Sequence, residues 1–334
     1  MKRLLWILLL AVIAAAGWFA WAVLAPVHPA PKTVLLLHPG YSSRRIAREL
    51  KNAGVIESES AFLIWHFVHR GRSLKAGEYL FERPASISEV HSRLARGDVF
   101  FHTVVVPEGY TMFDIAQAVE EAGLGPADEF VKAAKTETAL IGDLAPHATS
   151  LEGYLFPETY EFTRMQSMKD MAATMVKQFR QVARQVGLTP ESADAPPDRV
   201  ARTVTMASIV EKETAVPEER SLVAGVYYNR LAKKVALDAD PSIIYAELLV
   251  GAYTGALHHA DMSFPSPYNT YRNVGLPPGP IGNPGKGAIE AAMHPAASDY
   301  FYFVADAQGH HRFAKTLEEH DKNVAAYRRA MRGR

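Results

Sequence analysis

One glutamate stands on the apolar side of a predicted helix and is the first candidate for chemistry. The segment from Asp198 to Thr214 begins with a capping residue and contains no Gly or Pro, which predicts a helix. At helical spacing Glu211 shares its side with Ala207 and Val204. Burial disfavours a charged carboxyl group, so we expect the pKa of Glu211 to rise to about 6, which suits a general acid. A buried carboxylate held by a hydrogen bond or an arginine is the structural alternative.

Glu213 is expected to play a different part. It lies about 200° further round the same helix, beside Lys212 and toward the end of the segment. This position predicts a solvated or structural carboxylate that does not share the acid role of Glu211.

A second block of acids lies among aromatic residues between Leu151 and Tyr160. Glu152 and Glu158 stand there with Tyr154, in a chain bent by Gly and Pro. Sugars stack their C–H faces on aromatic rings and donate hydroxyl hydrogen bonds to carboxylates, so the block suits a sugar groove. A packed loop over the core is the other interpretation.

Further helices and stiff loops would have to position these groups. A helix is predicted from Glu218 to Ala232, and another opens at Pro241 with Asp240 as its cap. The loops from Ser266 to Tyr271 and from Gly275 to Gly285 are too rich in Pro and Gly for regular structure and could shape a site. The candidates for positioning a sugar are therefore Tyr228, Asn229, Asp240, Tyr268 and Asn269. Structural hydrogen bonding explains the Tyr and Asn residues equally well.

The N-terminal segment predicts a membrane span. Residues 4–24 carry no charged side chain, extend for about 30 Å as a helix and directly follow two basic residues. This arrangement places residues 1–3 in the cytoplasm and the remaining chain across the membrane. A cleavable signal peptide is the alternative, because small residues occur at 14–16 and at 20 and 22. The length of the run, with Trp18 and Trp21 near its end, favours an anchor.

A repeat with an offset of 69 residues follows a Pro-rich linker, residues 25–32. Each copy reads as an apolar strand, a Gly-Tyr turn, an N-cap, an amphipathic helix and a Gly stop, with Gly40 and Gly54 matching Gly109 and Gly123. The pattern predicts a small module of residues 33–125 that resembles LysM-like modules, which bind peptidoglycan glycans in other proteins. A structural spacer is the alternative. Residues 126–334 would form the catalytic domain.

Composition narrows the functional classes. The chain is 48% hydrophobic and 22% charged, and its formal net charge is zero, which argues against a nucleic-acid partner. It has no cysteine, so disulfides, thiolate chemistry and Cys-based metal sites are excluded. Its histidines do not fall at metalloprotease spacing. We therefore expect neither a metal nor a cofactor, and a fold of the α+β class.

Five separated blocks resemble the endolytic murein transglycosylases, the YceG-like family. They are Leu151–Tyr160, Ala207–Thr214, Asp240–Tyr245, Tyr268–Tyr271 and Gly275–Gly285. The resemblance implies that Glu211 is the catalytic acid. It also shows a departure, because Asp238 and Ala239 stand where the family commonly has Gln and then Ser or Thr.

The resemblance further implies a lyase reaction on peptidoglycan. Glu211 would protonate the oxygen leaving from the β-1,4 bond between N-acetylmuramic acid and N-acetylglucosamine, while the 2-acetamido group attacks C1. It would then take the proton of the C6 hydroxyl as a 1,6-anhydro ring closes, ending elongation of a nascent strand. The chain would be anchored in the inner membrane, with its catalytic domain in the periplasm and peptidoglycan synthases as possible partners.

Two other functions stay open. An ordinary muramidase would use water and would need a second acid, such as Glu152, Glu158 or Asp240, near Glu211. A glycan-binding scaffold without chemistry would act through residues 33–125.

Overall fold

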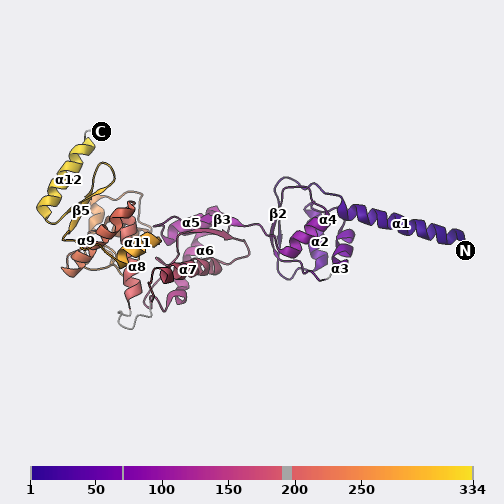
Figure 1. Ribbon diagram of the computed structural model, residues 1–334, viewed down its shortest axis with the longest axis horizontal. Helices are drawn as coiled ribbons and strands as arrows, with labels where there is room; N and C mark the ends of the chain where they lie inside the picture. Colours follow the sequence, from indigo (N-terminus) through magenta and orange to yellow (C-terminus); the bar gives the residue numbers. More distant parts are fainter. Residues whose placement is uncertain (1, 70, 190–197, 333–334) are drawn as a thin grey trace. The chain divides into compact units, whose positions relative to one another are not determined.

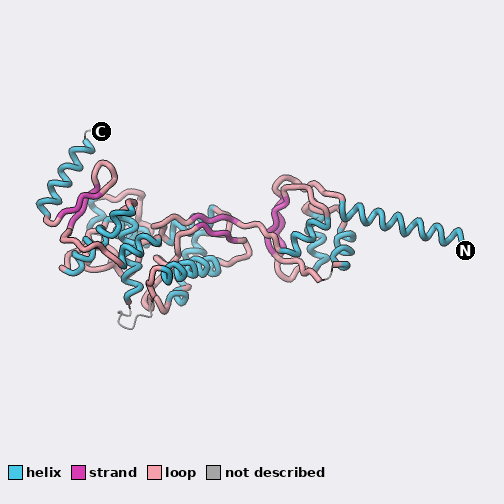
Figure 2. Tube along the Cα trace, in the orientation of Figure 1, coloured by secondary structure: helices cyan, strands magenta, loops and turns pink. Residues whose placement is uncertain are grey.

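The chain folds into two compact units. The computed structural model describes residues 2–69, 71–189 and 198–332. The first unit is Met1–Thr103 with Glu161–Gln166, and the second is Val104–Tyr160 with Ser167–Arg334. Helices dominate both units, and the strands of the described residues form three two-stranded sheets (Figures 1 and 2). The prediction of a mixed helix and strand fold is confirmed at this level.

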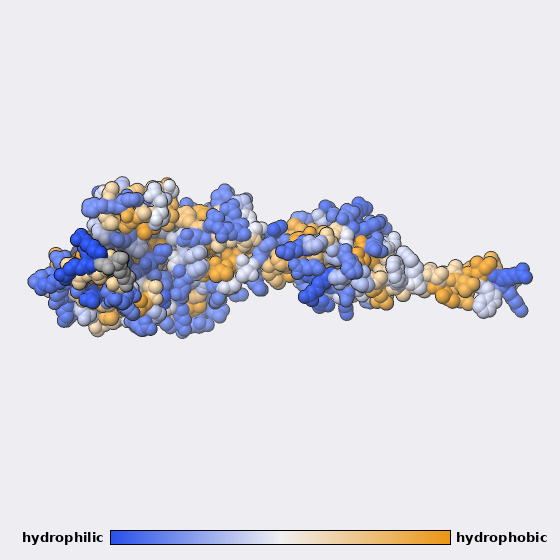
Figure 3. All heavy atoms as spheres, turned by 90° about the horizontal axis from the view of Figure 1, so that it is seen from above, coloured by the Kyte–Doolittle hydropathy of each residue, from blue (hydrophilic) through white to orange (hydrophobic). Residues whose placement is uncertain are grey.

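The first helix, α1 (Lys2–Leu24), matches the predicted apolar run. It is long and apolar enough to cross a membrane, a test that an N-terminal signal sequence also passes. Its surface is hydrophobic along much of its length and hydrophilic at its N-terminal end (Figure 3). The last turns of α1 belong to the folded unit, because Val23 is 1% exposed in its core and Phe19 packs against that core.

The first unit continues as a strand, two helices, a second strand and a further helix. These elements are β1 (Thr33–Leu37), α2 (Ser43–Asn52), α3 (Glu59–Val68), β2 (Gly77–Phe81) and α4 (Ile87–Arg96). β1 and β2 pair antiparallel, with Leu35 opposite Tyr79. A serine caps each of the three helices by accepting a backbone N–H bond.

Most of the second copy of the repeat lies in the second unit, although residues 102–103 and 161–162 belong to the first. It consists of β3 (His102–Val105), α5 (Met112–Glu121), α6 (Ala127–Thr136) and β4 (Thr159–Phe162). Gly40 and Gly109 have φ of 82° and 79°, and Gly54 and Gly123 have φ of 69° and 72°, a region that favours glycine. The two copies therefore share one local design, strand–helix–helix–strand. The division between units falls at residue 103 and not at the predicted 125, because α5 packs against α6, and α6 against α7 (Met168–Gln185).

The remainder of the second unit is arranged around α8 (Arg199–Glu213). Helices α9 (Arg220–Ala232), α10 (Asp240–Val250) and α11 (Lys286–Met293) all pack against it. The described part of this unit contains short 3-10 helices at Thr138–Ile141, Pro217–Glu219 and His259–Ser263. Asp240 is the first residue of α10 and not its cap, since Ala239 takes that position and the side chain of Asp240 accepts a bond from Tyr271. Asp198 precedes α8 as predicted, but its side chain makes no capping bond.

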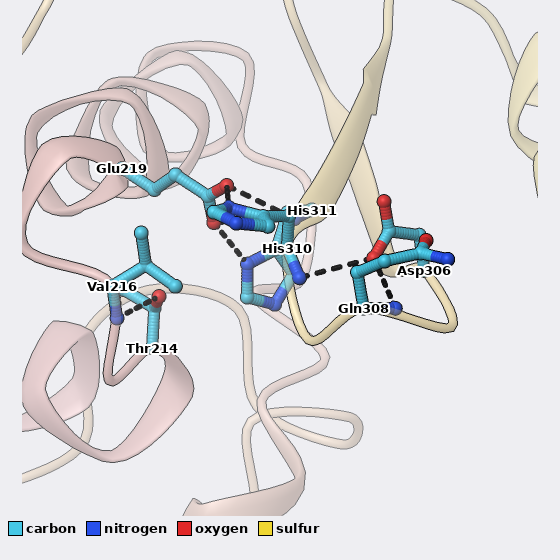
Figure 4. Close-up of polar contacts among 7 residues, drawn as sticks. All are labelled: Thr214, Val216, Glu219, Asp306, Gln308, His310 and His311. Carbon is cyan, nitrogen blue, oxygen red and sulfur yellow. Dashed lines mark hydrogen bonds and ion pairs between the residues drawn. The ribbon is translucent and has the colours of Figure 1, made fainter.

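A hairpin and a final helix end the unit. The hairpin consists of β5 (Tyr302–Ala305) and β6 (His311–Ala314), and α12 (Leu317–Arg332) follows. Asp306 Oδ1 accepts bonds from the backbone N–H groups of Gln308 and His310, which stabilises the turn of the hairpin (Figure 4). Glu219 accepts bonds from the backbone N–H of His311 and contacts both histidine rings. This carboxylate therefore joins the start of α9 to the hairpin.

Candidate active site

Glu211 lies in the last turn of α8 on the buried side, as predicted. Its side chain is 5% exposed. Oε1 accepts a bond of 2.9 Å from Arg220 Nη2, and Oε2 accepts one of 2.9 Å from the backbone N–H of Gly285. Arg220 also contacts Glu108 at 3.2 Å. Glu211 is therefore a paired carboxylate with both oxygens engaged.

Burial and pairing act on Glu211 in opposite directions. Burial raises its pKa, and the Gly285 N–H and the Arg220 guanidinium oppose that rise. A beta carbon at 285 would meet the side chain of Glu108, which would have to move aside. The raised pKa agrees with the sequence prediction, while the double pairing agrees with the structural alternative.

Glu213 lines a cavity of about 410 Å³ in the second unit, called here the Glu213 cavity. The cavity wall consists of Glu213, Tyr227, Arg230, Leu237, Asp238, Asp240, Tyr271, Tyr302, Phe303, Leu317 and His320. Tyr227 donates a hydrogen bond of 2.7 Å to Glu213 Oε1. Burial raises the pKa of Glu213 to about 7, and the nearby charge of Asp240 adds to the rise. Of the two predicted roles, solvated and structural, burial and the Tyr227 bond fit the structural one.

The rest of this wall is polar and charged. Asp240 accepts a bond of 2.5 Å from the Tyr271 hydroxyl. Arg230 donates bonds of 2.8 Å to Asp238 Oδ2 and to the Leu237 carbonyl. Asp238 has a φ of 52°, which is strained for a residue other than glycine. Such a mixture of carboxylates, tyrosines and one guanidinium suits a ligand rich in hydroxyl and amide groups.

A second cavity, of about 290 Å³, is lined by Tyr154, Tyr268 and the Pro277–Pro280 loop, and Glu152 stands in its wall. Glu152 is 2% exposed and accepts two bonds from the Met112 N–H and one of 2.8 Å from Asn283. Burial raises the pKa of Glu152 to about 8, against hydrogen bonds that include one from the Tyr245 hydroxyl. Glu152 therefore ties α5, α10 and the loop before α11 together. Glu211 lines neither this cavity nor the Glu213 cavity.

Comparison with known proteins decides the family. The sequence model described as the YceG-like family matches residues 35–326. The chain belongs to the YceG-like family. The endolytic murein transglycosylase of Bacillus subtilis strain 168 is 32% identical over 336 residues, covering 95% of this chain and 91% of the relative. That of Streptococcus pneumoniae serotype 2 strain D39 is 32% identical over 359 residues, and the match covers 95% of this chain but only 63% of the longer relative.

A solved structure of the same family is also similar. The crystal structure of a yceG-like protein from Listeria monocytogenes is 32% identical, with a TM-score of 0.56. The match covers 87% of this chain and 98% of the Listeria chain. The YceG-like fold therefore accounts for nearly all of this chain.

Several predicted positioning residues of this YceG-like chain support its backbone. Tyr228 donates to the Ala292 carbonyl at 2.9 Å. The Asn229 amide donates to the carbonyls of Ser298 and Tyr300, and that of Asn269 to Met262 and Phe264. These bonds fit the structural role that the sequence left open. Glu158 is exposed, and Asp240 alone of the positioning residues lines the Glu213 cavity.

The sequence interpretation missed the partners that define each carboxyl group. Tyr227, Arg230 and Tyr271 surround Glu213, and Arg220 holds Glu211. The sequence did contain one indication that two of these partners lie together: Tyr227 and Arg230 are three residues apart and share one face of a predicted helix. Within residues 2–69, 71–189 and 198–332, no group of three or more His, Asp or Glu side chains has the geometry of a metal site.

Proposed function

We propose that this chain is a membrane-anchored lytic transglycosylase that cleaves peptidoglycan strands internally and leaves 1,6-anhydro-muramoyl ends. Its relatives in Bacillus subtilis and Streptococcus pneumoniae are named endolytic murein transglycosylases. The observation that carries the site assignment is a single carboxyl group with a pKa of about 7 on the wall of a polar cavity at the end of α8.

The geometry favours Glu213 as the general acid. A pKa near 7 keeps its proton available at neutrality, and the cavity gives a sugar access to it. Among the hydrogen bonds of the described residues, Oε1 takes one from Tyr227 and Oε2 takes none, so Oε2 is free for the glycosidic oxygen. Glu211, the residue that the sequence predicted, is the second candidate. To donate a proton it would first have to leave Arg220 or the Gly285 N–H.

The reaction then needs one carboxyl group in two roles. Glu213 protonates the oxygen that leaves C1 of N-acetylmuramic acid, while the 2-acetamido oxygen of the same sugar attacks C1. The carboxylate so formed removes the proton of the C6 hydroxyl, whose oxygen displaces the acetamido group at C1. The ring closes as a 1,6-anhydro sugar, no water is consumed, and Glu213 regains its proton.

One observation favours a hydrolase as the competing function. Asp240 lies in the wall of the same cavity and could serve as a base for water. Its hydrogen bond from Tyr271 fixes that carboxylate in place. A hydrolase would leave reducing muramoyl ends instead of anhydro ends.

Mass spectrometry of the products separates these two reactions. The full-length chain in detergent is incubated with uncrosslinked glycan strands, and the new ends are weighed. We expect muramoyl ends lighter by one water, on fragments from within the strand. Reducing ends would establish the hydrolase with Asp240 as a candidate base, and an uncut strand would turn attention to glycan binding.

The pH dependence of kcat/KM should follow the raised pKa of Glu213. The acid form must be present when substrate binds, and the pKa of that group is about 7. We therefore expect kcat/KM to fall as the pH rises through about 7, since the proton is lost from the free enzyme. Initial rates between pH 5 and pH 9 on soluble glycan strands measure this limb. A rate that rises through pH 7 would require a group that acts as a base in the free enzyme.

The remaining predictions concern location and partners. We propose that α1 is an uncleaved anchor with its basic end in the cytoplasm, which places both units on the periplasmic side. Burial of Val23 in the core of the first unit supports retention of the helix. Cleavage after residues 14–16 would remove most of the helix that holds Val23 in place, and cleavage after residues 20–22 would leave Val23 at the new N-terminus. From the family resemblance we also propose that the first unit contacts glycan strands as LysM-like modules do. We propose in the same way that the chain associates with peptidoglycan synthases.

A further inference from the structure

An apolar stripe is exposed along α3 of the first unit. Ile64, Phe67 and Val68 are spaced by three and four residues, so they lie on one face of the helix. Their exposures are 48%, 59% and 69%, while Phe62 on the opposite face is fully buried. A row of large exposed apolar side chains on one helix indicates an interaction surface. We call these three residues the α3 stripe.

The α3 stripe lies near the point where α1 leaves the unit. α1 packs against α3 and α4 within the first unit. Figure 1 shows α3 at the end of this unit from which α1 extends. Val23 and Phe19 fix the joint, because both contact the core of the unit. The stripe and the apolar helix are therefore held in a defined relation to each other.

The length of α1 sets how close this joint is to a bilayer. The 17 residues from Lys2 to Trp18 extend for about 26 Å as a helix, less than the roughly 30 Å of a hydrocarbon core. The turns from Phe19 to Val23 are thus needed to complete the crossing, although they are already packed in the unit. Trp21 on these turns and Trp18 just before them are exposed, as is usual for residues at a membrane interface. The end of the unit that holds α3 must then lie at the level of the lipid headgroups.

We infer that α3 lies on the membrane surface and inserts the α3 stripe into the boundary between lipid headgroups and acyl chains. This inference rests on the proposed role of α1 as an anchor. Interfacial helices bury their apolar face about 5–10 Å deep and place basic residues beside it. Arg72, which is exposed just beyond the helix, supplies such a charge for lipid phosphates. The anchor is then a rigid joint that fixes the height and tilt of the first unit, and not a flexible tether.

Site-directed spin labelling tests the inference, because the natural chain has no cysteine. The full-length Phe67→Cys and Val68→Cys variants are labelled with a nitroxide and reconstituted as pure protein in phospholipid vesicles. Arg48→Cys is the matched control, at an exposed position of α2. We expect the labels at 67 and 68 to collide with oxygen in preference to a water-soluble nickel complex, with a ratio several-fold above that at 48.

A label at Val12→Cys, midway along α1, separates failure of this inference from failure of the anchor. Lipid exposure at 12, 67 and 68 would support the inference. Lipid exposure at 12 with aqueous collision at 67 and 68 would overturn it, and would leave the stripe for a protein partner. Aqueous collision at 12 would overturn both the anchor and the inference, without bearing on the glycan chemistry of the second unit.

Discussion

The Glu213→Gln variant is expected to lose about 10²–10⁴-fold in turnover on glycan strands, the usual contribution of a general acid. The glutamine keeps the shape of the side chain, and its amide oxygen can still accept the Tyr227 bond seen at 2.7 Å. It cannot donate a proton to the leaving oxygen or recover one from the C6 hydroxyl. Steady-state release of anhydro ends measures the loss, and an unchanged Tm would show that the fold is retained.

The Glu211→Gln variant is the comparison that decides between the two carboxyl groups. Its amide can accept from the Gly285 N–H or from Arg220, but the charge that balances Arg220 is gone. We expect a loss of stability of about 1–3 kcal/mol with most turnover retained after correction for folded protein. Full turnover in Glu213→Gln together with a dead Glu211→Gln would return the acid role to Glu211. Glu158→Gln, an exposed change in the aromatic block, is expected to be neutral in both assays.

Glu152→Leu is expected to destabilise the second unit by roughly 3 kcal/mol. The change leaves the Met112 N–H, the Asn283 amide and the Tyr245 hydroxyl without their shared acceptor. For a folding unit of this size the loss corresponds to a fall in Tm of about 6–12 °C. Thermal unfolding at pH 6 measures it, with Glu158→Gln as the matched control. A Tm within a degree or two of the natural chain would show that this carboxyl group is dispensable.

The same residue makes stability depend on pH. The pKa of Glu152 is about 8 in the folded chain, well above its ordinary value of 4.5, so the folded state binds a proton more tightly than the unfolded state. Its contribution is fully present below about pH 4.5 and is lost as the pH rises toward 8. Glu213, with a pKa of about 7, adds in the same direction. We expect Tm to fall across this window in the natural chain and to fall less in Glu152→Leu.

Local features followed closely from the sequence. The repeat offset, the positive-φ glycines and the serine caps depend on residues within a few positions of each other, so their local chemistry is sufficient. The same holds for α1, because a long apolar run is visible in the sequence without knowledge of its tertiary contacts. The hairpin turn at Asp306 is likewise stabilised by its own backbone.

Two features could not be predicted from the sequence: the division into units and the partners of each carboxyl group. The repeat suggested a module ending at 125, but packing of α5 on α6 and of α6 on α7 assigns most of the second copy to the other unit. Helical spacing predicted that Glu211 lies on the buried side of α8, which is correct. It also predicted that the opposite side of α8 faces solvent. α9 and α10 cover that side as well, so burial on α8 does not follow its own periodicity.

The sequence by itself determined the apolar N-terminal helix, the repeated strand–turn–helix pattern, the helix that bears Glu211 and Glu213, and the resemblance to the YceG-like family. Only the tertiary structure decided what each acid on that helix touches. Arg220 and Gly285 meet Glu211 from 9 and 74 residues away, and Tyr227 meets Glu213 from 14 residues away. The pKa of a carboxyl group depends on burial and on such distant charges and donors, which a local pattern does not contain. The family therefore follows from the order of residues, whereas the surroundings of each carboxyl group, on which our proposed choice of acid rests, follow from the fold.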